Sequence, residues 1–373
     1  MPFTNQTGNS NPATVNISAT FINRAIAPPP PSPSPPPLPP VSGFATNCEP
    51  GTFEYALGTA SLGKRYATSS NLQAVLPAAT TPVSITLCAG TTVANAALII
   101  ASGSSVSIGC TRITTPPSCV LDGGGLFQIL FVGANAELTL TGLALNNGTS
   151  TGSGGAVFVS AGATLVANGD AFKKDTAVYG GAVAESSAAV NVSNTTFSSD
   201  AGNFFGGAVY ARRGTVVAFN ASFTHDRSGY AGGAVAESSA AVNVSNAVFT
   251  TDTATSYGGA VYARRGTVAA FNASFIHDRA GYAGGAVFES NAAVDVSNAS
   301  FTSGTAYAGG AVYASGGTVA AFNASFTMNS AGVGGALYEY NAVINATNAS
   351  FVGGVSTYGA RCERATRRLL SIR

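Results

Sequence analysis

The sequence predicts an all-β fold, a right-handed parallel β-helix of about eleven turns with a short N-terminal capping helix. The segment GGA begins at Gly154 and recurs up to Gly334, at five intervals of 26 residues followed by two of 25. A phenylalanine follows each GGA at a nearly constant distance, from Phe172 to Phe351. Two sequence features that recur with the same period indicate a structural unit stacked on copies of itself. Only 9% of the residues are charged, and small residues abound, which suits tight stacking.

Alignment of the repeats on this phenylalanine predicts the course of one turn. The residue seven positions earlier is always Leu, Val or Ile, and the residue five positions earlier is Ala or Val. This spacing of two places both columns on the inner face of one strand. The residue three positions earlier is Asn in seven repeats and Gly169 in the eighth, which predicts a left-handed turn with stacked amides. A unit of about 25 residues fits three short strands joined by bends.

The start of the repeat region contains a pattern typical of a helix. Phe53, Ala56, Leu57 and Ala60 lie at positions i, i+3, i+4 and i+7. This spacing predicts a short amphipathic helix, which we expect to cover the open first turn of the β-helix.

Composition divides the chain into four parts. Residues 1–27 are polar and aperiodic, which predicts a disordered lead or a remnant of another domain. Residues 28–40 contain ten prolines, which predict an extended polyproline linker. The β-helix is expected over residues 48–360, and residues 361–373 form a basic tail with Cys362. We expect this tail to form a cap, to pair through Cys362 with another chain, or to stay disordered.

Charge and cysteine usage indicate a compartment. The net charge is +1, and no basic run interleaves with aromatic residues, so we expect no nucleic-acid partner. No apolar run reaches the length of a membrane helix.

The cysteines form two candidate disulfide pairs. Cys110 and Cys119 flank a short loop, and Cys48 and Cys88 form the second pair. The alternative is that these cysteines are reduced, buried thiols. Together with many glycosylation sequons, these pairs predict an extracellular, cell-surface or matrix protein, although the N-terminus lacks a secretion signal. We therefore expect the chain to be a fragment of a longer secreted protein.

Four asparagines are candidates for N-glycosylation. Asn191, Asn243 and Asn345 each lie six residues before the phenylalanine and start a sequon. Their parity is opposite to that of the core positions, so we expect them to face outward. Asn147 starts a sequon in a loop.

Charged residues alternate in a longer period of 52 residues. Glutamates and arginines occupy successive turns, namely Glu185, Arg212, Arg213, Glu237, Arg264, Arg265, Glu289 and Glu339. Since adjacent turns lie about 5 Å apart, this pattern predicts a surface charge ladder that keeps the turns in register. A second interpretation is a binding site for a charged polysaccharide.

A column of aspartates follows the phenylalanine by three residues, at Asp175, Asp200, Asp226, Asp252 and Asp278. We expect these side chains to cap turns, and calcium binding is the alternative. Stacked carboxylates repel one another, so cations or the nearby Lys174, Arg227 and Arg279 are expected to neutralise them. His225 and His277 lie two turns apart, about 10 Å, which is too far to share one metal ion. The sequence predicts no cofactor.

Phe219, Phe271 and Phe322 have the outward parity in every second turn. They predict an exposed aromatic stripe for sugar stacking or partner docking, and the alternative is packing under a neighbouring loop.

The paired motifs GGAV and FKKD, FSSD, FTHD, FTTD, FIHD or FTMN resemble the repeats of chlamydial polymorphic outer membrane proteins and of related pectin-lyase-like β-helices. Members of that family are surface-displayed adhesins. The proline-rich linker is similar to those of the pherophorin group of extracellular-matrix glycoproteins. The resemblance implies a non-catalytic structural or adhesive module that presents repeated ladders to a cell-wall or matrix polysaccharide or glycoprotein. A polysaccharide lyase, hydrolase or esterase is the alternative, but the acidic residues recur with the repeat, whereas a catalytic site would interrupt it.

Overall fold

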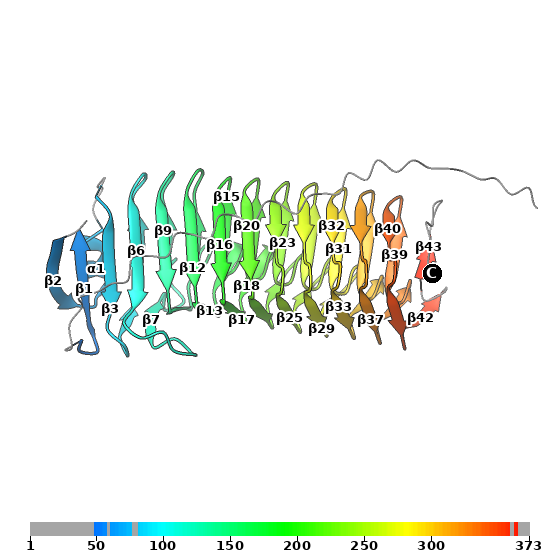
Figure 1. Cartoon of the computed structure of the whole chain (residues 1–373), viewed down its shortest axis with the longest axis horizontal. Helices are drawn as coiled ribbons and strands as arrows, with labels where there is room; N and C mark the ends of the chain where they lie inside the picture. The colour runs from blue at the N-terminus through cyan, green and yellow to red at the C-terminus, as the bar shows by residue number, and fades with distance from the viewer. Residues whose placement is uncertain (1–47, 58–59, 77–80, 359–361, 365–373) are drawn as a thin grey trace, which may run out of the picture. The chain divides into compact units, whose positions relative to one another are not determined.

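The computed structural model describes residues 48–57, 60–76, 81–358 and 362–364. These residues form a parallel β-solenoid of about eleven turns, as the repeat predicts (Figure 1). The predicted lead, residues 1–27, and the predicted linker, residues 28–40, lie outside the described residues. No helix in the described part of the chain is long and apolar enough to cross a membrane.

Four sheets run along the solenoid axis. Sheet A contains β2 (Ala60–Tyr66), β1 (Thr52–Leu57), β3 (Val83–Leu87), β6 (Ser105–Cys110), β9 (Glu137–Thr141), β12 (Thr164–Asn168), β16 (Ala189–Ser193), β20 (Thr215–Phe219), β24 (Ala241–Asn243), β28 (Thr267–Ala269), β32 (Ala293–Asp295), β36 (Thr318–Ala320) and β40 (Val343–Asn345). Sheet B contains β4 (Thr92–Ala94), β7 (Cys119–Asp122), β10 (Leu143–Asn146), β13 (Ala171–Lys173), β17 (Thr196–Ser198), β21 (Ser222–Thr224), β25 (Val248–Thr250), β29 (Ser274–Ile276), β33 (Ser300–Thr302), β37 (Ser325–Thr327) and β41 (Ser350–Val352).

The other two sheets lie on either side of the GGA segment. Sheet C contains β5 (Leu98–Ile100), β8 (Leu130–Val132), β11 (Val157–Val159), β15 (Val183–Ser186), β19 (Val209–Arg212), β23 (Val235–Ser238), β27 (Val261–Arg264), β31 (Val287–Ser290), β35 (Val312–Ser315), β39 (Leu337–Tyr340) and β43 (Cys362–Arg364). Sheet D contains β14 (Thr176–Tyr179), β18 (Ala201–Phe205), β22 (Arg227–Ser228), β26 (Thr253–Ala254), β30 (Arg279–Ala280), β34 (Thr305–Ala308), β38 (Ser330–Val333) and β42 (Val355–Tyr358).

A regular turn therefore visits sheets C, A, B and D in that order, which corrects the expected three strands to four. The additional strand is short. It forms because the backbone between the bend after sheet B and the GGA segment is extended. This segment pairs with the equivalent segments of the preceding and following turns of the solenoid. Part of the predicted tail, residues 361–373, continues the solenoid, since β43 pairs in parallel with β39.

The core is filled by the phenylalanine column. The rings from Phe172 to Phe351 stack in sequence with centroids 4.7–4.9 Å apart and nearly parallel planes. The aliphatic column of sheet A packs beside them, as Val216 and Val242 illustrate at 2% exposure. Both predicted core columns are confirmed, and they hold adjacent turns at the spacing that the backbone ladder requires.

The GGA segment is dictated by the backbone. Gly180 has a φ of 60°, which favours glycine. Gly181 has another constraint, because a Cβ atom there would lie 2.2 Å from the carbonyl oxygen of Gly207 in the next turn. The first glycine thus permits the bend from sheet D to sheet C, and the second permits the close approach of two turns.

The asparagine column forms the predicted turn. Its members, from Asn194 to Asn348, have φ values of 51–56°. Asn220 Nδ2 donates to Asn194 Oδ1 at 2.8 Å, and Asn272 Nδ2 donates to Asn246 Oδ1 at 2.7 Å. The left-handed turn and the amide ladder are both confirmed.

The N-terminal end differs from expectation. Residues 52–57 form β1, which is antiparallel to β2 and β3, and not a helix. The first strand of a solenoid leaves unpaired N–H and C=O groups, and a strand satisfies them whereas a helix does not. The short helix lies later, as α1 (Ser69–Ala74), with Leu72 buried. Gln73 of this helix satisfies backbone groups of β5, the first strand of sheet C. Its side chain accepts from Ile99 N at 2.7 Å and donates to Ile99 O at 3.2 Å.

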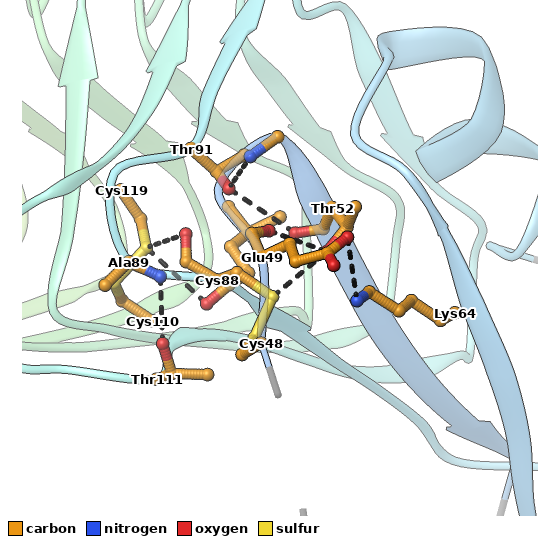
Figure 2. The surroundings of a disulfide bond; sticks show 12 residues. Cys48, Glu49, Thr52, Lys64, Cys88, Ala89, Thr91, Cys110, Thr111 and Cys119 are labelled. Atoms are coloured by element: carbon orange, nitrogen blue, oxygen red, sulfur yellow. Dashed lines mark hydrogen bonds and ion pairs between the residues drawn. A yellow bond between two sulfur atoms is a disulfide. The ribbon is translucent and has the colours of Figure 1, made fainter. Parts of the chain in front are cut away.

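Both candidate cysteine pairs are bonded in this end of the solenoid, as Figure 2 shows. The Cys48–Cys88 bridge ties the entering chain to the end of β3, and Cys110–Cys119 closes the loop between β6 and β7.

Candidate functional site

The glutamates of the 52-residue period lie inside the solenoid, so the predicted surface charge ladder is wrong. Glu185 and Glu237 are each 1% exposed. Glu185 Oε2 accepts a hydrogen bond from Ala188 N at 2.9 Å, and Oε1 accepts one from Gly214 N in the next turn at 3.0 Å. Glu237 repeats both bonds at 3.0 and 3.1 Å. These carboxylates cap the turn between sheets C and A.

Strand register explains why no ladder forms. Glu185 and Glu237 each lie beside Ala211, and the arginines lie in the next column. A Cβ atom at Gly214 would be 2.2 Å from both the Ala188 carbonyl oxygen and Glu185 Oε2, so the backbone and the glutamate together leave room only for glycine there. Burial raises the pKa of Glu185 to about 7, against the opposing effect of its backbone hydrogen bonds.

The aspartate column also faces inward, at the turn between sheets B and D. From Asp200 onward, each Oδ1 accepts the backbone N–H of the aspartate in the preceding turn, as in Asp200 N to Asp226 Oδ1 and Asp226 N to Asp252 Oδ1, both at 2.9 Å. The first member, Asp175, accepts instead from Gly148 N at 2.6 Å. Turn capping is therefore confirmed. Lys174, Arg227 and Arg279 are exposed beside the buried aspartates, and no ion pair joins the two sets among the described residues. The expected neutralisation by these basic residues is wrong.

The second oxygen of each column aspartate is buried without a partner, at Asp175, Asp200, Asp226, Asp252 and Asp278. Burial is the largest cause that raises the pKa of these groups well above the ordinary value, and neighbouring aspartates raise that of Asp200 further. Asn329 occupies the same column. Its Oδ1 accepts from Gly304 N at 2.8 Å, and its Nδ2 donates to Phe301 O at 3.1 Å. A neutral side chain therefore fits this column.

The described residues contain no group of three or more His, Cys, Asp or Glu side chains arranged to hold a metal ion. His225 and His277 are exposed turn residues with positive φ, two turns apart.

The outer face of sheet C displays the arginines. Parallel register aligns one residue from each strand in a row that we name the Ser/Arg column, namely Ser186, Arg212, Ser238, Arg264, Ser290 and Ser315. Arg212 and Arg264 are exposed. Two turns separate them, a rise of about 10 Å at ordinary strand spacing. Arg213 and Arg265 follow them in the turn and are also exposed.

Two residues earlier on the same face is a second row. Its rings form the sheet C aromatic column, which consists of Tyr210, Tyr262, Phe288, Tyr313 and Tyr338, with Ala236 between the first two. Consecutive rings from Tyr262 onward are 5.0–5.5 Å apart. Phe205, the last residue of β18, and Tyr257, which follows β26, pack on this column. Together they form an apolar cluster outside the main core. The repeat pattern did not predict this cluster, although tyrosine follows GGAV or GGAL in four repeats.

A rim of more exposed rings borders this cluster. Phe204, Tyr230, Tyr282 and Tyr307 are 53%, 38%, 52% and 55% exposed. Tyr282 and Tyr307 stack with centroids 5.9 Å apart, and Tyr230 contacts Tyr257 edge to face at 5.4 Å. Aromatic rings with a free face are the surfaces on which sugar rings and protein partners pack.

The predicted aromatic stripe lies on a different side. Phe219, Phe271 and Phe322 end the sheet A segment of alternate turns and are 52%, 47% and 45% exposed. The alternative, packing beneath a loop, is therefore wrong. Because these rings lie two turns apart, they form separate apolar spots and make no ring contact with one another.

The candidate glycosylation sites lie on or near the surface. Asn345 is exposed, and Asn191, Asn243 and Asn147 are half-buried. Asn243 Oδ1 accepts from Ser245 N at 3.0 Å, and Asn147 Nδ2 donates to Asp122 Oδ1 at 3.1 Å. Their occupancy stays a prediction.

Comparison of the chain with models of known protein families, with curated proteins and with solved structures finds no match. The architecture and the side chains of the chain itself are therefore the basis for inferring its function.

Proposed function

We propose that this chain is a non-catalytic structural or adhesive module of a cell wall or extracellular matrix, secreted or held at the cell surface. It presents repeated rows of side chains to glycans or to glycoprotein partners. The observation that supports this proposal is the division of the repeat into two sides. The repeated carboxylates are buried in hydrogen bonds to the backbone, whereas arginines, serines and aromatic rings line the outer face of sheet C.

The same division argues against the enzyme alternative. Acid–base cleavage or de-esterification of a polysaccharide needs a carboxyl group within hydrogen-bond reach of the substrate. Glu237 and Asp226 are each at most 1% exposed, so neither reaches a chain bound outside. The resemblance of the repeats to polymorphic outer membrane proteins and pectin-lyase-like β-helices, together with the pherophorin-like linker, supports a surface or matrix setting. The two disulfides agree with an oxidising compartment.

The test is to incubate the full chain with a panel of acidic and neutral cell-wall polysaccharides, with and without calcium. New chain ends and retained protein are then quantified. We expect retention on at least one polymer without new chain ends. Turnover of any polymer would overturn the proposal. A melting temperature that falls on addition of a chelator would identify calcium as part of the scaffold.

A further inference from the structure

The Ser/Arg column has the charge pattern of a site for a sparse linear polyanion. Arg212 and Arg264 are exposed and form no ion pair within the described residues. The acidic residues of the neighbouring column, Glu185 and Glu237, are buried beneath sheet C and bonded to backbone amides. The outer face of sheet C therefore has positive charges with no opposite charge beside them, because the carboxylates of the neighbouring column are buried.

Tyr210 and Tyr262 lie beside the two arginines on the outer face of sheet C. The main influence on the pKa of Tyr210 is burial, which raises it, and the Arg212 charge acts in the opposite direction. The same opposition holds for Tyr262 and Arg264. Tyr210 and Tyr262 lie two residues before Arg212 and Arg264 on the same strands, so each arginine has a tyrosine as its neighbour on the outer face. Tyr210 is half-buried and Tyr262 is buried.

The spacing of the charges selects among polyanions. Arg212 and Arg264 are separated by two turns, about 10 Å, with Ser238 between them. Phosphates of a nucleic-acid strand recur every ~3.4 Å, which is too dense for this row. A homopolymer of uronic acid has a carboxylate on every sugar, so every second carboxylate would face a serine instead of an arginine. A polymer whose uronic acid alternates with an uncharged sugar places one carboxylate at each arginine and an uncharged sugar at each serine between them.

We propose that the Ser/Arg column binds an acidic polysaccharide in which a uronic acid alternates with an uncharged sugar, lying along the solenoid axis. Arg212 and Arg264 bind successive carboxylates, and Ser186, Ser238 and Ser290 hydrogen-bond to the uncharged sugars between them. This inference rests on the proposed function and names its ligand. Individual contacts at exposed arginines are weak, so affinity comes from several sites on one polymer and falls with salt.

The test uses the full chain and four immobilised probes: hyaluronate, in which glucuronate alternates with N-acetylglucosamine; polygalacturonate; hydroxyethyl cellulose; and an oligothymidylate. We expect the tightest binding to hyaluronate. Arg212→Gln with Arg264→Gln should weaken it about tenfold or more. The matched control is Arg227→Gln with Arg279→Gln, which removes the same charge at the same two-turn spacing from sheet D. The control should change binding less than about twofold, because its arginines lie on another sheet.

A register swap separates spacing from charge. Arg212→Ser combined with Ser238→Arg keeps the composition but brings the two arginines of the column into adjacent turns. We expect the swap to lower affinity for hyaluronate and to raise affinity for polygalacturonate. All positions are on the outer face, and circular dichroism verifies that each variant is folded.

The outcomes distinguish this inference from the proposed function. If all polyanions, the oligothymidylate included, bind in order of their charge density and the swap changes nothing, the inference is wrong. If the protein is retained only by the neutral polymer or by none of the four probes, the inference is again wrong. The proposed function stands in each case unless the polysaccharide panel yields new chain ends.

Discussion

The aspartate and glutamate columns are two buried rows of carboxyl groups in one solenoid, and they differ in how their oxygens are used. Asp226 accepts one backbone hydrogen bond through Oδ1, and its Oδ2 has no partner. Glu237 accepts backbone hydrogen bonds with both oxygens, one from its own turn and one from the next. The aspartate column therefore needs one acceptor per turn and tolerates a neutral group, whereas the glutamate column needs two acceptors.

The largest effect that we expect from the two buried columns is on the pH dependence of the free energy of unfolding. Burial raises the pKa of Glu185, Glu237 and Glu289 from 4.5 to about 7 and raises that of the column aspartates as well. The folded chain thus keeps protons that the unfolded chain releases. The contribution of these glutamates to stability is full below pH 4.5 and is lost as the pH rises through about 7, and the aspartates act in the same direction. We expect a lower urea midpoint at about pH 8 than at about pH 5.

The control for this prediction replaces three carboxyl groups of the aspartate column by amides, through Asp200→Asn, Asp226→Asn and Asp252→Asn. The variant should show a flatter pH profile, because amides do not titrate. A profile that rises with pH in the original chain, or one that the three substitutions leave unchanged, would contradict the assignment.

Glu237→Gln should lower stability by about 1–3 kcal/mol, because one amide acceptor replaces two and a backbone N–H is left buried and unpaired. The N–H groups at stake belong to Ala240 and Gly266. The free energy of unfolding in urea at about pH 8 measures the loss. Equal stability of the variant and the original chain would mean that one of these bonds contributes nothing.

Asn246→Ala should have a smaller effect, about 1 kcal/mol. Asn246 has a φ of 55° and accepts a hydrogen bond from Asn272 in the amide ladder. Asn246→Gly is the matched variant, since glycine adopts the left-handed backbone conformation without strain and loses only the side-chain hydrogen bond. If alanine and glycine are equally tolerated, the left-handed backbone has no energetic role here.

Asp226→Asn should have the smallest effect, within about 0.5 kcal/mol at pH 5, because the amide retains the acceptor for Asp200 N. Asn329 already shows this arrangement in the same column. Asp226→Ala is the contrasting variant, and it should cost about 1–3 kcal/mol by leaving that N–H unpaired. Similar losses for Asn and Ala would show that the column needs a carboxyl group after all.

The sequence predicts the repeat-based part of this molecule well. Period, the phenylalanine column and the asparagine turn follow from residues that recur in every turn, and stacking demands such recurrence. The helix that the sequence predicts at the first strand is wrong, because Phe53 to Ala60 fits a helical spacing over too short a segment to exclude an alternating strand.

The candidate site could be predicted only in part. The parity rule correctly places Phe219 outward, and the sequence correctly predicts that Asp226 caps a turn. It wrongly places Glu185 in a surface ladder and expects charges to neutralise Asp226, because burial of a carboxyl group is uncommon. Their hydrogen-bond partners come from other turns, and those contacts depend on register. The tyrosine after GGAV was visible in the sequence, but only register reveals that Tyr262 and Phe288 stack into one outer column.

We expect the aspartate column to be a neutral hydrogen-bond ladder of the fold, which leaves the outer face for function. Infrared spectroscopy of the carboxyl groups at neutral pH tests it most directly, because protonated acids and carboxylates absorb at different frequencies. We predict a protonated-acid band in the original chain that shrinks when Asp200, Asp226 and Asp252 are replaced by asparagine. A spectrum with carboxylate bands alone would contradict the claim and return these aspartates to consideration as charged, cation-binding groups.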